Sequence, residues 1–458
     1  MAPPLPEPAS PHDEAAAPEV RRAPARRWRP AFPVVRPGLA GGARDAGRGD
    51  AVPDVRGLAA PGLAAALGVA LGSRLALFGI ALVAMGVVGV KHVARHLLVP
   101  RVDVLHGDIG RLLDPWTHWD GVWYWRVAAH GYTTVAHTAF YPLYPLTMRA
   151  AAGLLGSYVL AGVVVSTVCF VAAATLLYRL LADEVSPRVA FWAVAFLSVF
   201  PTSFFFQAVY RESLFLLLSV ACFWAARHGR WLLAGLLGLL AVLAHATGLL
   251  LVVPIALSFI EEGQRSGDWS RVRLLRGAAG LALVPAGMFV YMGYLAVTLG
   301  DPTAFMQAEH DWGRQLTAPW TTVWQGIQAG YHGLQYLIAG FATGTGATWP
   351  LNPGMAFGNF IALIALVVAA LLLALGWQRL PLAYSAYALA VVVYPLLFST
   401  LHRPLLSLPR LILPAFPLFV AAAVLTERRP ALHWTLVCVS TVALVYLTVR
   451  FVHFSWVA

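Results

Sequence analysis

Charged residues are scarce in this chain, and their scarcity excludes an ordinary soluble domain. Only 12% of the 458 residues are charged, whereas a soluble domain carries about a quarter. The three cysteines all lie within apolar runs, so we expect neither a disulfide framework nor a cysteine metal cluster. Lysine occurs once, at Lys91, so arginine supplies nearly all of the positive charge behind the net +11.

Long apolar runs are what the sequence has in abundance. Hydrophobic residues make up 59% of the chain. Runs of about 20 apolar residues, such as 159–178 and 357–377, are long enough to cross a bilayer as helices. Helices satisfy their own backbone in lipid, and the runs lack the polar–apolar alternation of barrel strands. The sequence therefore predicts an all-α, polytopic transmembrane helical bundle of about eleven spans with long extracytoplasmic loops. Within it we expect an irregular segment at 139–146, a second span at about 150–178, a helix break near 245–248 and a second long outside loop at 300–355.

The first 56 residues differ from the rest of the chain. They are rich in proline, alanine, glycine and arginine, and they lack helical periodicity. We predict a disordered basic tail at 1–56 and a transmembrane domain at 57–458. The positive-inside rule places this tail in the cytoplasm, and we expect the protein in the plasma (inner) membrane. Topology and anionic lipid headgroups explain the arginines, so no nucleic-acid partner is expected.

The first predicted outside loop carries the strongest candidate for chemistry. Five tryptophan or tyrosine rings, among them Trp119 and Tyr124, crowd one carboxylate at Asp120. An interfacial aromatic belt would produce the same stretch of rings. A carboxylate desolvated among aromatic rings is a stronger base, however, and it can accept a proton from a hydroxyl nucleophile. Asp120 is therefore the predicted catalytic residue, with Trp119 and Tyr124 as predicted sugar or lipid contacts.

Further candidates for substrate binding lie in other loops and at the ends of spans. Arg211 and Glu212 equally suit a structural salt bridge. Arg410, helped by His402 or Arg211, is the first candidate for binding a substrate phosphate, and snorkelling to the headgroups is its alternative role. The neighbours 309–311 point in different directions on a helix, so we expect no metal there. The complete set is Tyr144, Arg211, Glu212, His245, Glu309, His310, Trp312, His402 and Arg410.

These polar candidates fall on one side of the membrane in the predicted topology. A pore or secondary transporter places such groups at mid-depth, where Arg74 is the clearest example in this chain. Their common position favours an active site at the outer surface that receives a lipid-linked substrate.

The order and spacing of several motifs resemble one enzyme family. The motifs are Trp119-Asp120 followed by Gly131-Tyr132, then segments 140–145, 200–215 and 234–250, and Pro409-Arg410 before 414–419. In these features the chain resembles the PIG-V-type mannosyltransferases, the family of GPI mannosyltransferase II and its bacterial relatives in the GT-C superfamily. The chain departs from the family pattern at His245, where relatives often carry an arginine.

The resemblance implies a GT-C-type fold and an inverting glycosyl transfer on the extracytoplasmic face. It implies a polyprenyl-phosphate donor, usually of mannose, a glycan or glycolipid acceptor, and a catalytic base at Asp120. No cofactor is expected, because the leaving group is already a phosphate. Three alternatives stay open at this stage. They are a lipid or solute transporter or flippase, the same enzyme class with another sugar, and a structural membrane subunit.

Overall fold

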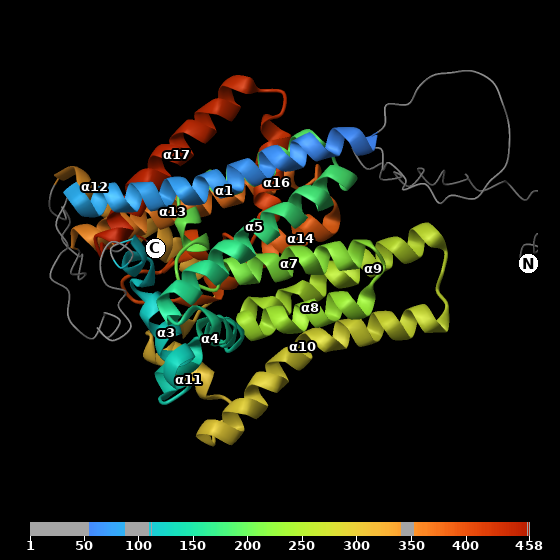
Figure 1. Ribbon diagram of the computed structural model, residues 1–458, viewed down its shortest axis with the longest axis horizontal. Coiled ribbons are helices and arrows are strands. Elements are labelled where there is room, and N and C mark those ends of the chain that lie inside the picture. The colour runs from blue at the N-terminus through green and yellow to red at the C-terminus, as the bar shows by residue number, and fades with distance from the viewer. Residues whose placement is uncertain (1–54, 88–109, 111, 340–351, 456, 458) are drawn as a thin grey trace, which may run out of the picture. The chain divides into compact units, whose positions relative to one another are not determined.

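The structure is a computed structural model that describes residues 55–87, 110, 112–339, 352–455 and 457. This part of the chain is mainly helical (Figure 1), which confirms the predicted all-α class. Its only sheet pairs β1 (Gln315–Leu316) with β2 (Phe398–Ser399) in antiparallel register. The predicted tail at 1–56 lies outside the described residues, except for 55 and 56 at the start of the first helix.

Six segments of the described chain are long and apolar enough to cross a bilayer, which confirms an integral membrane protein. They lie in α1 (Val55–Val87), α5 (Tyr158–Glu184), η5 (Ala246–Leu251) with α9 (Val252–Ser266), α10 (Arg271–Leu299), α13 (Pro353–Gly376) and α17 (Pro430–Val452). Shorter apolar helices are α6 (Pro187–Val199), α8 (Trp231–Ala244), α14 (Leu382–Val393) with η6 (Tyr394–Leu397), and α16 (Phe416–Thr426). The count of about eleven spans stays a prediction.

The region expected as one span at 150–178 is two helices. α4 (Leu143–Leu155) ends at Gly156, whose φ of +71° suits glycine, and Ser157 then caps the start of α5. The expected irregular segment at 139–146 is helical from Leu143, because Pro145 lies in the first turn, where its missing N–H is tolerated.

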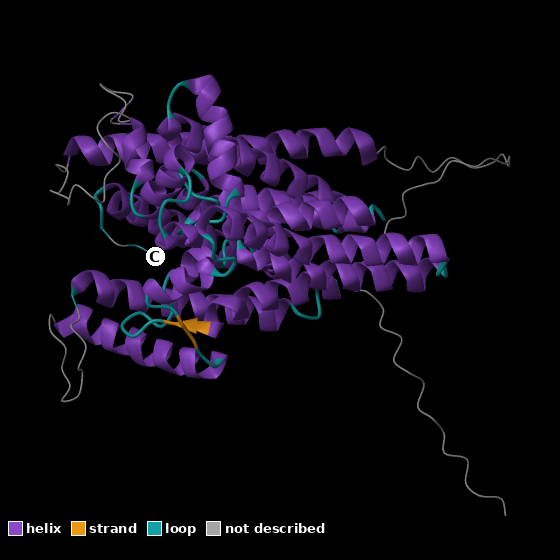
Figure 2. Cartoon of the chain, turned by 90° about the horizontal axis from the view of Figure 1, so that it is seen from below, coloured by secondary structure: helices purple, strands orange, loops and turns teal. Residues whose placement is uncertain are grey.

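The prediction of a second long loop at 300–355 is wrong in part, because this segment contains α11 (Ala304–Asp311) and α12 (Pro319–Ala339). α12 packs antiparallel on α13, and its glycines permit close approach: a Cβ at Gly330 would meet Leu363 and one at Gly333 would meet Ala356. Figure 2 shows these helices beside the small sheet. α12 therefore has a partner along one face while its other face exposes large apolar side chains, namely Trp320, Trp324, Ile327, Tyr331, Leu337 and Ile338.

The predicted break near 245–248 is confirmed, since α8 ends at Ala244 and η5 follows His245. α8 then packs closely against α10 (Figure 1). Gly280 lies against the Trp231 carbonyl, and Gly235 lies against the backbone of Gly280. Glycine at these positions allows the two backbones to approach more closely than larger residues would.

Arg74 of α1 is 1% exposed, and its guanidinium forms hydrogen bonds with the end of α6 and the irregular segment that follows it. Its guanidinium donates to the carbonyls of Ser198 and Ser203 at 3.1 and 2.7 Å and to the Ser203 hydroxyl at 3.1 Å. The same group lies 4.4 Å from the centre of the Phe170 ring. Arg74, which was singled out for its mid-depth position, thus joins α1 to α5, α6 and η4 (Ser203–Phe206).

A second polar cluster joins four helices at the end of α7 (Glu212–Arg227) remote from Glu212. Arg227 pairs with Glu184 of α5 at 2.6 Å and with Glu261 of α9 at 3.2 Å. The Tyr384 hydroxyl of α14 donates to Glu184 at 2.8 Å. These charge-assisted bonds hold α5, α7, α9 and α14 together at this end.

The candidate site forms where several short elements meet the opposite end of α7. The elements that carry its side chains are α3 (Asp120–His130), η4, the start of α7, α15 (Leu408–Leu411) and the end of α17.

Candidate active site

Arg410 lies between two carboxylates that are distant in the sequence. Its Nη1 pairs with Asp120 Oδ2 at 2.5 Å, and its Nε lies 3.4 Å from Glu212 Oε1. The side chains of Arg410 and Glu212 are 7% and 3% exposed, whereas that of Asp120 is 23% exposed. Asp120 is therefore the member of this cluster that an incoming molecule can reach.

Tyr210 fixes the backbone that carries Asp120. Its hydroxyl donates to the His118 carbonyl at 2.9 Å and accepts from the Asp120 N–H at 3.1 Å. Its ring lies 5.4 Å from the Arg410 guanidinium carbon. Tyr210 thus contacts both the main chain of Asp120 and the cation that pairs with it.

Strained backbone surrounds the same place. Among the described residues, the non-glycine residues with positive φ are Trp119, Ser407 and Phe454, at +60°, +60° and +58°. Trp119 directly precedes Asp120, and Ser407 directly precedes the short helix that holds Arg410. The Phe454 ring lies 4.9 Å from that of Trp119. Such conformations cost free energy and cluster at functional sites, which marks this cluster as a functional candidate.

A small cavity opens onto the cluster. Its volume of about 10 Å³ is that of a single water, and its walls combine Asp120 and Arg410 with aromatic and apolar side chains. The lining residues are Trp119, Asp120, Phe205, Tyr210, Arg410, Phe451 and Val457.

A second buried arginine contacts α3 through Tyr124, which lies one helical turn after Asp120. Arg211 is 8% exposed, and its Nη1 donates to the Tyr124 hydroxyl at 2.8 Å. Tyr124 is on the same face of α3 as Asp120, four residues later. The Tyr144 ring packs 5.1 Å from that of Tyr124, and its hydroxyl contacts Ser166 of α5 at 2.9 Å. Tyr144 therefore supports Tyr124 through packing.

The remaining predicted residues are spread around this core. Trp312 stacks edge-on against Trp123 at 5.3 Å, and Glu309 pairs with Arg314 at 3.0 Å. His310 is exposed on α11. The His402 carbonyl accepts a bond from Asn359 of α13 at 3.2 Å. His310 therefore makes no hydrogen bond or ion pair with Asp120 or Arg410, and no three potential metal-binding side chains lie together among the described residues.

Burial and charge set the ionisation of the groups around Asp120. Burial lowers the pKa of Arg410, but the carboxylates of Asp120 and Glu212 outweigh this effect and raise it above its ordinary value. Burial raises the pKa of Tyr124 to about 12. Arg410 is thus a permanent cation and Tyr124 a neutral hydroxyl, which leaves a carboxylate as the base that this cluster can offer.

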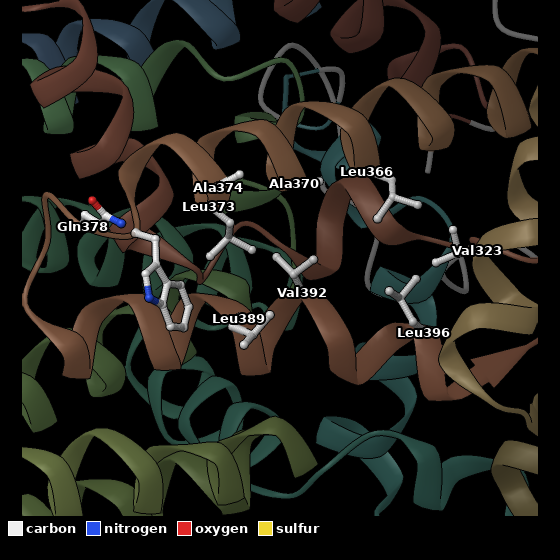
Figure 3. A pocket seen from close by; sticks show the side chains of 10 residues that line it. Val323, Leu366, Ala370, Leu373, Ala374, Gln378, Leu389, Val392 and Leu396 are labelled. Carbon is white, nitrogen blue, oxygen red and sulfur yellow. The ribbon is translucent and has the colours of Figure 1, made fainter.

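An apolar cavity of about 580 Å³ lies between α13 and α14 (Figure 3). Figure 3 shows Leu373 of α13 and Leu389 and Val392 of α14 along it. Val323 of α12 and Leu396 of η6 lie at one end, and Trp377 and Gln378 also contribute to the lining. Its walls suit a hydrocarbon chain more than a sugar.

Sequence reasoning missed Tyr210, Phe205 and Phe451 as site residues. Tyr210 directly precedes Arg211 in a motif that had been singled out, so its position was a usable signal. Phe451 lies in the last apolar helix, α17, where nothing in the sequence distinguishes it from its lipid-facing neighbours.

Comparisons with known proteins agree with the resemblance found in the sequence. The family described as Mannosyltransferase (PIG-V) matches residues 92–263. Human GPI alpha-1,6-mannosyltransferase 2 is 27% identical over 209 residues, which cover 43% of this chain and 40% of the human protein. GPI mannosyltransferase 2 of Drosophila pseudoobscura pseudoobscura is 33% identical over 109 residues, 21% of this chain and 24% of the fly protein. The matches thus span less than half of these relatives.

The solved structures that match this chain are more distant. The Archaeoglobus fulgidus oligosaccharyltransferase in its apo form has a TM-score of 0.37 at 12% identity, over 84% of this chain and 56% of that one. The same organism's AglB, in complex with an inhibitory peptide and a dolichol-phosphate, has a TM-score of 0.40 at 12% identity, over 86% and 56%.

The family match covers Asp120, Arg211, Glu212 and His245, whereas Arg410 lies outside it. Over residues 92–263, this chain is similar to the PIG-V mannosyltransferases, which confirms the predicted resemblance.

Proposed function

We propose that this protein is an inverting glycosyltransferase that moves a mannosyl residue from a polyprenyl-phosphate donor to a hydroxyl group of a glycan or glycolipid. The observation that carries the proposal is the position of Asp120, a partly exposed carboxylate in the wall of an aromatic cavity, paired with a buried arginine. The similarity to the PIG-V mannosyltransferases supports both the reaction class and the sugar.

In the proposed reaction, Asp120 takes the proton of the acceptor hydroxyl as that oxygen attacks the anomeric carbon. The new glycosidic bond forms on the face opposite the breaking bond to the phosphate, so the anomeric configuration inverts. The polyprenyl phosphate leaves with the bonding electron pair, and the proton ends on Asp120. Arg410 pairs with Asp120 and orients its carboxylate before the reaction.

The donor's prenyl chain is suited to the apolar cavity between α13 and α14. We place the active site on the extracytoplasmic side of the plasma membrane. The arginine-rich segments favour the cytoplasmic side, and in the predicted topology the site residues lie on the other side. Glu309 and Trp312 would then flank the acceptor from α11 and the residue that follows it.

The test measures transfer of labelled mannose from polyprenyl-phosphate mannose by membranes that contain the protein. We expect a labelled product with wild type and a loss of about 10²-fold or more with Asp120→Asn, since general bases contribute roughly that much. Asp311→Asn is the matched control, because it makes the same chemical change at an exposed position and should leave transfer intact. Wild-type transfer by Asp120→Asn would refute Asp120 as the base.

The same assay separates the enzyme from a transporter. A transporter moves the labelled lipid between leaflets without forming a new product. If wild-type membranes make no labelled product from mannosyl, glucosyl or arabinosyl polyprenyl phosphates, the proposed enzyme class is wrong.

A further inference from the structure

The two buried arginines near Asp120 differ in how far their charge is compensated. Arg410 faces two carboxylates, at 2.5 and 3.4 Å. Arg211 makes no ion pair with any residue in the described segments. A guanidinium has five N–H donors, and the bond to Tyr124 uses one of them. Arg211 is thus a buried cation, 8% exposed, with donors left for an anionic ligand.

His245 offers a second donor in the same region. The Thr247 N–H donates to Nδ1 of His245 at 3.4 Å, and the Thr247 hydroxyl lies 2.6 Å from the same nitrogen. Nδ1 is therefore the acceptor, so the neutral ring carries its proton on Nε2. Burial lowers the pKa of His245, and the charges of Arg211, Arg314 and Arg410 lower it further. A neutral ring with an Nε2–H, in the positive field of three arginines, suits an anion.

α3 links Arg211 to the cluster around Asp120. Tyr124, whose hydroxyl accepts from Arg211, lies on the same face of α3 as Asp120, four residues later. Arg211 therefore belongs to the same site as the carboxylate that we propose as the base.

We propose that Arg211, with the Nε2–H of His245, binds the phosphate of the lipid-linked donor, while Arg410 stays with Asp120 and Glu212. This inference rests on the proposed function and replaces Arg410, the choice from sequence, by Arg211. The chemistry recognised is a phosphate monoester or diester attached to a prenyl chain. Guanidinium forks bind phosphate oxygens in pairs, so a lysine at position 211 would be a poorer partner.

The experiment measures binding of farnesyl phosphate to the purified full-length protein in lipid nanodiscs, with farnesol as the uncharged comparison. We expect Arg211→Gln to weaken farnesyl phosphate binding by about tenfold or more, because hydrogen bonds to charged groups are worth about 1.5–3 kcal/mol. Farnesol binding should not change. Arg211→Lys should fall between wild type and Arg211→Gln.

The matched comparison is the double variant Arg410→Gln with Glu212→Gln, which removes two charges together and leaves no buried charge unpaired. It should bind farnesyl phosphate within about threefold of wild type, since its phosphate contacts are at Arg211. The reverse pattern, with loss in this double variant and none in Arg211→Gln, would overturn the proposal. Equal losses for farnesol and farnesyl phosphate in Arg211→Gln would overturn it as well.

Two further variants keep the proposal testable if Arg211→Gln does not fold. Tyr124→Phe removes the hydroxyl that holds Arg211, and His245→Phe removes the Nε2–H, and each should weaken farnesyl phosphate binding several-fold without affecting farnesol. Normal farnesyl phosphate binding in both would refute the subsite. Inorganic phosphate that binds as tightly as farnesyl phosphate would refute a lipid-linked ligand.

The binding and transfer assays fail independently. Phosphate-selective binding that depends on Arg211, without sugar transfer from any polyprenyl donor, would support the subsite and refute the proposed reaction. Mannosyl transfer with normal binding by Arg211→Gln would support the reaction and refute the subsite.

Discussion

Replacing Arg410 by glutamine should destabilise the protein chiefly through the charge it leaves behind. Glu212 is 2% exposed, and neither of its carboxylate oxygens accepts a hydrogen bond from any group in the described residues. Arg410 is its only ion-pair partner in that part of the chain. Removing one member of a buried pair costs about 3–5 kcal/mol, because the other charge remains in a low-dielectric site.

Glu212 should account for most of this cost, and Asp120 for little of it. The Asp120 side chain is 23% exposed and can be solvated when Arg410 is lost, whereas that of Glu212 is 3% exposed. Adding Glu212→Gln to Arg410→Gln should therefore restore most of the lost stability. We expect a coupling free energy of about 2–4 kcal/mol between positions 410 and 212.

The assay is unfolding of the four proteins of this double-mutant cycle in one detergent, followed by tryptophan fluorescence. Asp120→Asn serves as the comparison, with an expected loss of about 1 kcal/mol. If Arg410→Gln and the double variant unfold at the same denaturant concentration, Glu212 is not an uncompensated charge in the single variant, and the reasoning is refuted.

Three other predictions concern stability. Gly280→Ala should cost about 1–3 kcal/mol because its Cβ would meet the Trp231 carbonyl, whereas Gly293→Ala in the same helix meets open space and should be neutral; equal unfolding of the two would contradict the close packing of α8 on α10. Burial raises the pKa of Asp114 to about 6, so between roughly pH 4 and 6 the folded state keeps a proton that the unfolded state has released. The free energy of unfolding should therefore fall by about 1 kcal/mol over this range, a value reduced to allow for the partial exposure of Asp114. Asp114→Asn should remove this pH dependence when unfolding is measured at several pH values. Tyr384→Phe should cost about 1–2 kcal/mol by deleting the bond to Glu184, and unchanged thermal unfolding would show that this bond does not stabilise the protein.

The membrane class and several breaks between helices were predictable because they leave local signals. The interruption at His245 is an example, since Gly248 follows it closely in the sequence. The structure explains this glycine, because a Cβ at position 248 would clash with backbone atoms of Ala241 and Val242. α12 was not predicted, because its glutamines, threonines and glycines lower its average hydropathy. Its apolar residues instead recur on one helical face, as Trp320, Trp324 and Tyr331 indicate.

The candidate site was predictable residue by residue but not as an arrangement. Asp120, Glu212 and Arg410 each stand out as a charge in an apolar chain. Their contacts join positions 290 residues apart in the case of Asp120 and Arg410, and only the packing of α3, α7 and α15 brings them together. The sequence likewise did not distinguish the paired Arg410 from the unpaired Arg211, because that difference depends on which carboxylate each guanidinium meets.

Arg74 has a consequence for how the chain enters the membrane. It lies near the centre of the apolar part of α1, where an arginine adds about 2.5–3.5 kcal/mol to the cost of insertion. The carbonyls that satisfy it belong to Ser198 and Ser203, 124 and 129 residues later in the chain. During synthesis α1 therefore lies in the bilayer without the hydrogen-bond acceptors of Arg74 until α6 and η4 have been made. α1 should be inserted in the bilayer less stably in a ribosome-bound chain that ends before residue 198 than in one that extends well past residue 203.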